Sequence, residues 1–376
     1  MTLGIASGQQ PNPDPQSLPT PLLPAEQAWV TTLEAPPSAP GAMDRERVYI
    51  PQQNDQITAL DRETGEVAWV RAIESSWPPV VGDGAVFLAA SDEFHALDAA
   101  TGGSRWRVGI DRPLLAPPTF ADGSVLAIIQ RGDVISLRSK DGSEAWRHRL
   151  GSDSPRSALV PGEAGTVYVS LDRGQLVALS LADGHEIWRQ TLPGALSDPV
   201  WAPGRVFVGS TDNFFYALDS KDGSLKWKWR SGGDVIGAAV DEGLVFFASL
   251  DNVIRAVNRG NGNQRWRKDT GTRPLVPPKA FGRLALVAGT SPTLTGFSAK
   301  DGSAAGTYLA PGELEGEPLI DPVLRPYSVA AVVVLRDGQV VGLSPVAMLF
   351  KELPAAPMTG LPGRVLQREQ SPQRRN

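Results

Sequence analysis

Side chains that commonly carry out chemistry are sparse in this chain. The sequence has no cysteine, which excludes disulfides, thiolate metal sites, a cysteine nucleophile and a lipid-modified cysteine within these residues. Its three histidines, His95, His148 and His185, stand far apart without the spacing of metal ligands, so we interpret each as a surface residue. No nucleophile elbow, P-loop or dinucleotide-binding glycine motif is present. We therefore predict no catalytic residue, no metal and no cofactor.

Two Asp-Asn pairs are the nearest approach to a metal-binding motif. Asp212-Asn213 and Asp251-Asn252 occupy equivalent positions about forty residues apart. Carboxylate and amide oxygens can bind calcium, but their recurrence at one place in a repeat favours a role in turns.

The elements that would position any site come from a repeat of about forty residues. Its first complete copy runs from Ala59 to Trp69 and reads A-L-D-R-E-T-G-E-V-A-W. Seven copies have a turn glycine, and successive spacings are 37, 40, 42, 39, 39 and 40 residues. Several short apolar runs in each repeat predict the blades of a β-propeller. The turn glycines are Gly65, Gly102, Gly142, Gly184, Gly223, Gly262 and Gly302.

Each copy has the residues that a β-hairpin needs. An alternating strand leads into Asp-x-x-Thr-Gly or a similar turn, where glycine adopts a positive φ and Asp or Thr can bond the turn backbone. A tryptophan then falls at a fixed place on the outgoing strand, where a large flat ring can pack against the next blade. The copy from Gly296 to Gly306 lacks it. The predicted docking tryptophans are Trp69, Trp106, Trp146, Trp188, Trp227 and Trp266, joined by Trp29 one period earlier.

The two ends of the repeat region complement each other. Residues 25–33 include Trp29 but have no other strands of a blade before them, and residues 329–343 supply strands without a docking turn. Closing a ring with a strand from the other terminus removes the exposed sheet edges. We therefore predict an all-β, eight-bladed propeller of four-stranded antiparallel blades, closed by the N-terminal strand. In an alternative closure, Leu349-Phe350 forms the last outer strand.

The predicted blade limits follow from the repeat. They are residues 41–72, 78–110, 117–150, 157–192, 198–230, 236–269, 277–310, and 317–345 together with 25–33.

The motif A-x-D-x-x-T/D-G-x-x-x-W resembles the tryptophan-docking motif of the propellers named after pyrroloquinoline quinone. The resemblance covers about residues 26–345, and it implies that each indole N–H bonds backbone of a neighbouring blade. Two subfamilies differ in function: quinoprotein dehydrogenases are enzymes, whereas BamB-like proteins are bacterial envelope scaffolds with eight blades and no cofactor. The paired cysteines that the dehydrogenases usually carry are absent here, and their calcium ligands cannot be matched. The resemblance thus favours a BamB-like scaffold that binds the outer-membrane barrel-inserting machine or unfolded clients, with a pyrroloquinoline-quinone-dependent dehydrogenase as the alternative.

Composition excludes other classes of function. The net charge of −5 and a pI near 5.4 argue against nucleic-acid binding. No docking tryptophan is followed by Asp, and most are followed by Arg or Lys, which argues against a WD-type signalling propeller. No apolar run reaches the length of a membrane helix, so we expect no transmembrane span. We also expect the protein to be a monomer.

The two ends of the chain suggest its location. Residues 1–24 are rich in proline and are expected to be a disordered spacer, which could tether the propeller to an anchor, and residues 346–376 a poorly ordered basic extension. No leader is visible, so a periplasmic or envelope location follows from the resemblance, with the cytoplasm as the alternative.

Propeller topology also predicts a binding face. Loops that join one blade to the next, and loops between second and third strands, open on the same side of a propeller. We expect opposite charges there to hold each other and to pair again with a protein partner, whereas the docking turns on the other side are too alike to discriminate. The predicted partner-binding residues are Trp77, Arg112, Arg156, Asp198, Asp234 and Arg273.

Overall fold

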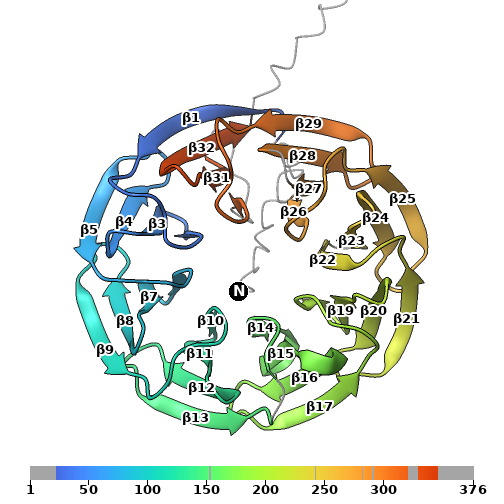
Figure 1. Cartoon of the computed structure of the whole chain (residues 1–376), viewed down its shortest axis with the longest axis horizontal. Coiled ribbons are helices and arrows are strands. Elements are labelled where there is room, and N and C mark those ends of the chain that lie inside the picture. Colours follow the sequence, from blue (N-terminus) through green and yellow to red (C-terminus); the bar gives the residue numbers. More distant parts are fainter. Residues whose placement is uncertain are drawn as a thin grey trace, which may run out of the picture. The chain divides into compact units, whose positions relative to one another are not determined.

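The computed structural model describes residues 23–151, 154–241, 243–281, 283–289, 292–320 and 329–345, all within the unit Met1–Val346. Its strands form eight separate four-stranded antiparallel sheets, arranged as blades around a ring (Figure 1). This confirms the predicted all-β, eight-bladed propeller. In the described residues, no helix is long and apolar enough to cross a membrane.

The first four blades contain sixteen strands, in order from the channel outward. Blade 1 contains β2 (Ala42–Met43), β3 (Arg47–Gln52), β4 (Gln56–Asp61) and β5 (Val67–Ala72). Blade 2 contains β6 (Val80–Gly82), β7 (Ala85–Ala89), β8 (Glu93–Asp98) and β9 (Ser104–Gly109). Blade 3 contains β10 (Thr119–Ala121), β11 (Ser124–Ile129), β12 (Asp133–Arg138) and β13 (Glu144–Arg149). Blade 4 contains β14 (Val160–Pro161), β15 (Thr166–Leu171), β16 (Gln175–Ser180) and β17 (Glu186–Thr191), with short 3₁₀ turns at Glu163–Gly165 and Asp172–Gly174.

The other four blades follow the same order, except that the last takes its outer strand from the N-terminal part of the chain. Blade 5 contains β18 (Val200–Ala202), β19 (Arg205–Gly209), β20 (Phe214–Asp219) and β21 (Leu225–Arg230). Blade 6 contains β22 (Val235–Val240), β23 (Leu244–Ser249), β24 (Val253–Asn258) and β25 (Gln264–Asp269). Blade 7 contains β26 (Lys279–Phe281), β27 (Leu284–Ala288), β28 (Thr293–Ser298) and β29 (Ala304–Leu309). Blade 8 contains β30 (Leu319–Ile320), β31 (Ala331–Val334), β32 (Gln339–Pro345) and β1 (Ala25–Thr32). The predicted limits enclose all of these strands, apart from the first residue of β22.

The second and third strands of each blade are buried on both faces. In β3, for example, the run from Val48 to Gln52 is buried throughout, because a blade is sandwiched between its two neighbours. Outer strands alternate instead, as in β9 and β13, because only one of their faces meets another blade. This explains why the sequence shows continuous apolar runs in the middle of each repeat and alternation at its end.

The ring closes through β1, which pairs antiparallel with β32. Val30 lies opposite Val341, and Trp29 opposite Gly342, next to a register shift. The predicted closure through Trp29 is therefore confirmed. In the alternative closure, Phe350 lies outside the described residues, and the outer position that it would fill is occupied by β1.

Seven tryptophans connect consecutive blades in the same way. Each indole N–H donates to a main-chain carbonyl of the next blade at 2.8–3.2 Å, and each ring lies against the positive-φ turn glycine of that blade. A Cβ added to Gly184, for example, would lie 2.4 Å from the Trp146 ring, so only glycine fits. The acceptors for Trp29, Trp69, Trp106, Trp146, Trp188, Trp227 and Trp266 belong to Arg62, Ala99, Ser139, Leu181, Ser220, Arg259 and Ala299, respectively.

The junction of blades 7 and 8 is built differently. Gly306 of β29 stands at the tryptophan position and pairs with Gly296, where most copies have alanine. Leu23, only 1% exposed, fills this space: positions for a Cβ on Gly296 and Gly306 would lie 2.8 and 3.2 Å from its side chain. The core therefore extends into the stretch 1–24 that was expected to be only a spacer.

Candidate functional site

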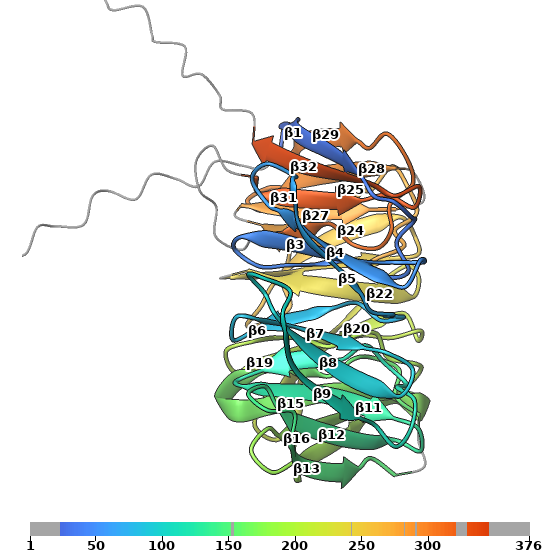
Figure 2. The same cartoon turned by 90° about the vertical axis from the view of Figure 1, so that its left-hand side faces the viewer.

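The hairpin order of each blade places its loops on two opposite faces, as the edge-on view shows (Figure 2). We call the face with the blade-to-blade connections and the loops between second and third strands the connection face. The turn face has the turns between third and outer strands, against which the tryptophans pack, and those between first and second strands. The predicted partner-binding residues all belong to the connection face.

Aspartates in the turns between third and outer strands are bonded within their own turns. Asp98 accepts from the main-chain and side-chain donors of Thr101 and from Arg105, and Asp141 accepts twice from Ser143. These donors favour the ionised form: Arg105 and then Thr101 lower the pKa of Asp98 to about 2. Similar bonds lower the pKa values of the remaining turn-face aspartates in this group, which are Asp141, Asp183, Asp219, Asp222 and Asp301.

On the connection face, Arg112 is tied to a buried carboxylate. Its Nη1 lies 2.8 Å from Asp133 Oδ2, and Arg149 Nε lies 2.9 Å from the other oxygen. The bond from Arg149 and then that from Arg112 lower the pKa of Asp133, against the effect of burial. Arg112 therefore holds the start of β12, and it does not pair with Asp198 or Asp234 as the sequence suggested.

The other predicted connection-face residues differ in how far they are engaged. Arg156 is exposed and makes a loose contact of 3.5 Å with Asp172, not with a carboxylate across the mouth. Trp77 is half-buried and packs against the core of blades 2 and 3. Within the described part of the chain, neither the exposed Arg273 nor the half-buried Asp234 has a side-chain hydrogen bond or ion pair.

A hollow of about 560 Å³ lies at the channel mouth. Asp198 faces it, together with Lys279 of β26 and Glu317, which form an ion pair. Surrounding protein and then the nearby Glu317 raise the pKa of Asp198, although Lys279 opposes them. The apolar and glycine lining of the hollow comes from the consecutive blades 7, 8, 1 and 2, at Pro40, Gly41, Pro78, Ala280, Gly316, Pro318, Leu319 and Ile320.

Sequence reasoning missed Lys279. It placed Asp198 among the binding residues, but Lys279 begins an inner strand that otherwise looks structural. Its position right after Pro277-Pro278, where a connection enters a blade, was the one available signal.

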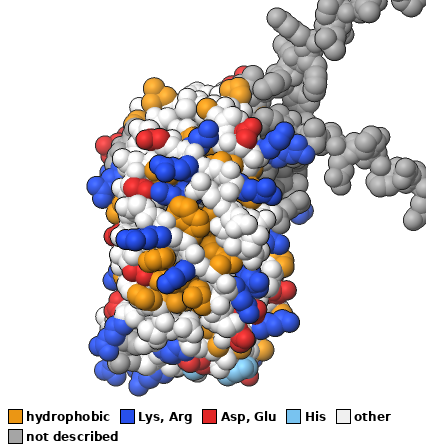
Figure 3. Space-filling view, turned by 90° about the vertical axis from the view of Figure 1, so that its right-hand side faces the viewer, with side chains coloured by type: hydrophobic (Ala, Val, Ile, Leu, Met, Phe, Trp, Pro, Cys, Tyr) orange, Lys and Arg blue, Asp and Glu red, His pale blue; other side chains and the backbone are white. Residues whose placement is uncertain are grey.

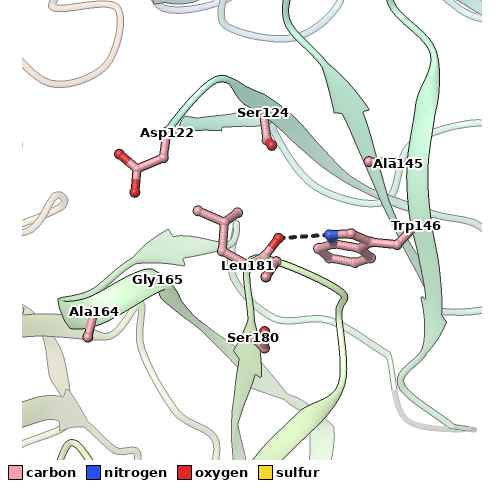
Figure 4. Close-up of a pocket in the computed structure, with 9 residues that line it drawn as sticks. Asp122, Ser124, Ala145, Trp146, Ala164, Gly165, Ser180 and Leu181 are labelled. Carbon is pink, nitrogen blue, oxygen red and sulfur yellow. Dashed lines mark hydrogen bonds between the residues drawn. The ribbon is translucent and has the colours of Figure 1, made fainter.

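A second hollow of about 350 Å³ lies between blades 3 and 4, beside the Trp146 indole (Figure 4). Figure 4 shows the indole N–H bonded to the Leu181 carbonyl at its edge, with Asp122 and Ala164 on the far side. Asp122 supplies the only carboxylate among the nine lining residues. We therefore assign this hollow to the tryptophan contact between blades.

The Asp-Asn pairs act in turns. Asn213 and Asn252 both have positive φ, of 67° and 61°, a conformation that asparagine tolerates better than most residues. Asp212 accepts from Tyr216 and from the Phe214 main chain, and Asp251 is bonded to Arg255. Among the described residues, no group of three or more His, Asp or Glu side chains is placed to hold a metal ion.

The observed class of protein is an eight-bladed propeller whose consecutive blades are tied by tryptophans, with charged groups gathered at one mouth. A family model described as outer membrane protein assembly factor BamB matches residues 25–93, 71–195, 130–235 and 229–346. The chain belongs to this family.

The individual proteins that this chain resembles share only a low sequence identity with it. The outer membrane protein assembly factor BamB of Moranella endobia (strain PCIT) is 28% identical over 109 residues, an alignment that spans 27% of this chain and 28% of that protein. The crystal structure of BamB from Moraxella catarrhalis has a TM-score of 0.70 at 18% identity, covering 85% of this chain and 99% of that one. A quinohemoprotein alcohol dehydrogenase from Pseudomonas putida HK5 has a TM-score of 0.66 at 13% identity, covering 93% and 78%. At these identities, both structural likenesses show the fold alone.

Proposed function

We propose that this protein is a non-catalytic scaffold of the bacterial envelope that binds another protein at its connection face. The observation that carries the proposal is the contrast between the two faces. The aspartates in the turns between third and outer strands are bonded within those turns, whereas Asp234 and Arg273 on the connection face have no side-chain partner in the described part of the chain. Rigidly held polar groups without internal partners are available to a ligand.

The channel mouth supports the same proposal, because the ionised Asp198 there lowers the stability of the fold. An Asp198 carboxylate whose pKa is raised is less stable ionised in the folded protein than in the unfolded chain, so it lowers stability at neutral pH. Groups that lower stability without a structural benefit are often retained for function. An extended partner segment that carries a basic residue would relieve this cost by pairing with Asp198.

The family supports a proposal for the kind of partner. Its name assigns the family to outer-membrane protein assembly. We therefore take the periplasmic part of the barrel-inserting machine, or an unfolded client, as the protein that docks on the connection face. With this partner, we also propose a location in the periplasm or at the envelope.

The test is capture of the purified periplasmic domain of that machine from the same bacterium. We expect Arg156→Glu with Arg273→Glu to weaken binding by at least roughly tenfold, because both side chains are exposed and only loosely engaged. Arg112 is left intact, because reversing it would leave the Asp133 carboxylate short of a partner.

The matched control reverses two exposed lysines of the turn face, Lys140→Glu with Lys221→Glu. Both double variants should keep the wild-type melting temperature. A loss of binding seen only in the control variant would show that the partner binds the turn face instead of the connection face. Dye reduction by the chain supplied with pyrroloquinoline quinone, calcium and an alcohol or sugar would contradict the non-catalytic assignment.

A further inference from the structure

The rim of the propeller is unevenly charged. Outer strands β9, β13, β17, β21 and β25 of blades 2–6 hold eleven Lys and Arg and three Asp and Glu, in a chain whose net charge is −5. Outer strands β29, β1 and β5 hold one basic and one acidic residue. The basic side chains are therefore gathered on one part of the rim.

Blades 3 and 4 neutralise their share of this charge internally. Arg147 pairs with Glu144 at 2.8 Å, Arg149 with Asp133 at 2.9 Å, and Arg189 with Glu186 at 2.7 Å. Paired guanidinium groups of this kind present little net charge to a partner.

Blades 5 and 6 leave most of theirs unpaired, because among the described residues of β21 and β25 only Lys226 forms an ion pair, with Asp219 at 3.2 Å. On β21 and β25, five basic side chains form no ion pair within the described residues. We call this surface the basic edge; Figure 3 shows this side of the molecule, where Lys and Arg surround a hydrophobic stretch. The five side chains are Lys228, Arg230, Arg265, Arg267 and Lys268.

Apolar side chains lie among these charges. Leu225 of β21 is 47% exposed. Trp229, two residues after the docking Trp227, is half-buried: its ring packs against Phe247 with centroids 5.7 Å apart, and the Arg255 guanidinium lies 5.3 Å from its centroid. Its indole N–H has no hydrogen-bond partner among the described residues, so the docking contacts do not explain this tryptophan.

We propose that the basic edge binds the surface of a bilayer containing anionic phospholipid. Exposed Lys and Arg are attracted to anionic headgroups, and their aliphatic stems can lie along the apolar region while the charges stay at the headgroups. A braced indole whose N–H has no hydrogen-bond partner among the described residues, on the same strand as the exposed Leu225, suits the boundary between headgroups and acyl chains. The acidic chain as a whole disfavours nucleic acid, and a planar headgroup layer requires no shaped pocket on the rim.

This surface differs from the connection face, so the two proposals can fail separately. The test is co-sedimentation of the purified full chain with phosphatidylcholine vesicles, with and without phosphatidylglycerol. We expect binding only when phosphatidylglycerol is present, and weaker binding at high salt. Trp229→Phe should reduce the blue shift of tryptophan fluorescence that accompanies binding.

Lys228→Glu with Arg267→Glu should lower the apparent affinity for phosphatidylglycerol vesicles by at least roughly tenfold. Lys140→Glu with Lys300→Glu makes the same charge change on exposed turn-face residues and should leave binding intact, with melting temperatures checked for both. Equal binding to pure phosphatidylcholine, no binding to either vesicle, or an equal loss in the control variant would overturn the proposal. Binding to polyglutamate but not to vesicles would overturn it as well, in favour of an acidic protein partner.

Discussion

At the scale of single residues, the connection face contains a group that opposes folding. The Asp198 carboxylate shares the channel mouth with the ion pair of Lys279 and Glu317, and its raised pKa means that ionisation costs stability. The cost is absent below the usual aspartate pKa of about 3.9 and is fully present once the pH exceeds the raised value. Replacing Asp198 should therefore raise the stability of the protein while it weakens partner binding.

We expect Asp198→Asn to raise the melting temperature by about one or two degrees at pH 7, a small effect because the Asp198 side chain is exposed to solvent, which screens its charge. The gain should vanish near pH 3, where the wild-type carboxyl is also neutral. Thermal unfolding at both pH values measures it. A gain that persists at pH 3 would show that the effect is not one of ionisation.

The turn-face aspartates should show the opposite dependence. Arg105 and Thr101 hold the pKa of Asp98 at about 2, so its contribution to stability is present above the usual value of about 3.9 and is lost as the pH falls toward 2. We expect Asp98→Asn to lower the melting temperature at pH 7 and to lower it less near pH 2. A constant difference across this range would show that the turn geometry, rather than the charge, is responsible.

At the scale of elements, the tryptophan contact needs two parts from two blades: an indole on one outer strand and a glycine turn in the next blade. Blade 8 has no such turn, because β32 and β1 come from opposite ends of the chain. A tryptophan on β29 would have nothing to dock on. This explains why the seventh copy lost its tryptophan, and Leu23 occupies the vacated space.

We predict that Leu23→Ala destabilises the protein by roughly 2–3 kcal/mol, because two adjacent glycines leave a cavity that backbone movement cannot close. Deleting residues 1–24 should lower stability similarly, although the sequence predicted only a disordered spacer there. Deleting residues 1–33 should cost more, since β1 and Trp29 are also lost. Denaturant unfolding of the three variants measures the order, and an unchanged midpoint for Leu23→Ala would remove Leu23 from the core.

The loss of a buried side chain also predicts how much one docking tryptophan contributes to the free energy of unfolding. Trp188, which is 8% exposed and donates to the Ser220 carbonyl at 3.0 Å, should cost roughly 3–5 kcal/mol when replaced by alanine. Trp188→Phe should cost less, because the ring contact with Gly223 is kept while the hydrogen bond is lost. Equilibrium unfolding separates the two, and equal losses would mean that the hydrogen bond dominates.

At the scale of the whole molecule, blade 8 is joined to the rest of the ring differently from the other seven blades. The junction of blades 8 and 1 has the Trp29 contact and a 2.9 Å bond from the Val329 main chain to Glu63, whereas the junction of blades 7 and 8 has Leu23 in place of an indole. Blade 8 is also the only blade whose outer strand is not joined to its third strand by a turn. We infer that the ring opens first at blade 8.

Native-state hydrogen exchange in low denaturant tests this inference. Amides of β1, β31 and β32 should exchange through a partial opening, at a lower free energy than those of blades 3–5. Leu23→Ala should lower that free energy further and leave blades 3–5 nearly unchanged. Uniform exchange across all blades would show that the ring unfolds as one unit.

The sequence by itself determined the architecture, because the features that define a blade are local. The spacing between a turn glycine such as Gly65 and Trp69, repeated about every forty residues, dictates a hairpin and places a ring on one face of it. The complementary ends, with Trp29 one period before Trp69, were enough to predict the closure. The connection face also followed, because topology alone decides which loops share a side.

Only the tertiary structure decided which groups meet across the ring. Asp198 and Lys279 come from blades 5 and 7, and their approach depends on how far the inner strands lie from the channel axis, which no spacing encodes. Arg112 pairs with Asp133 because of loop conformation, not charge pattern. Leu23 reaches Gly296 and Gly306 only once the ring has closed and brought the N-terminal segment beside blade 7. Contacts within a repeat can be predicted from its period, whereas contacts between distant repeats require the closed geometry.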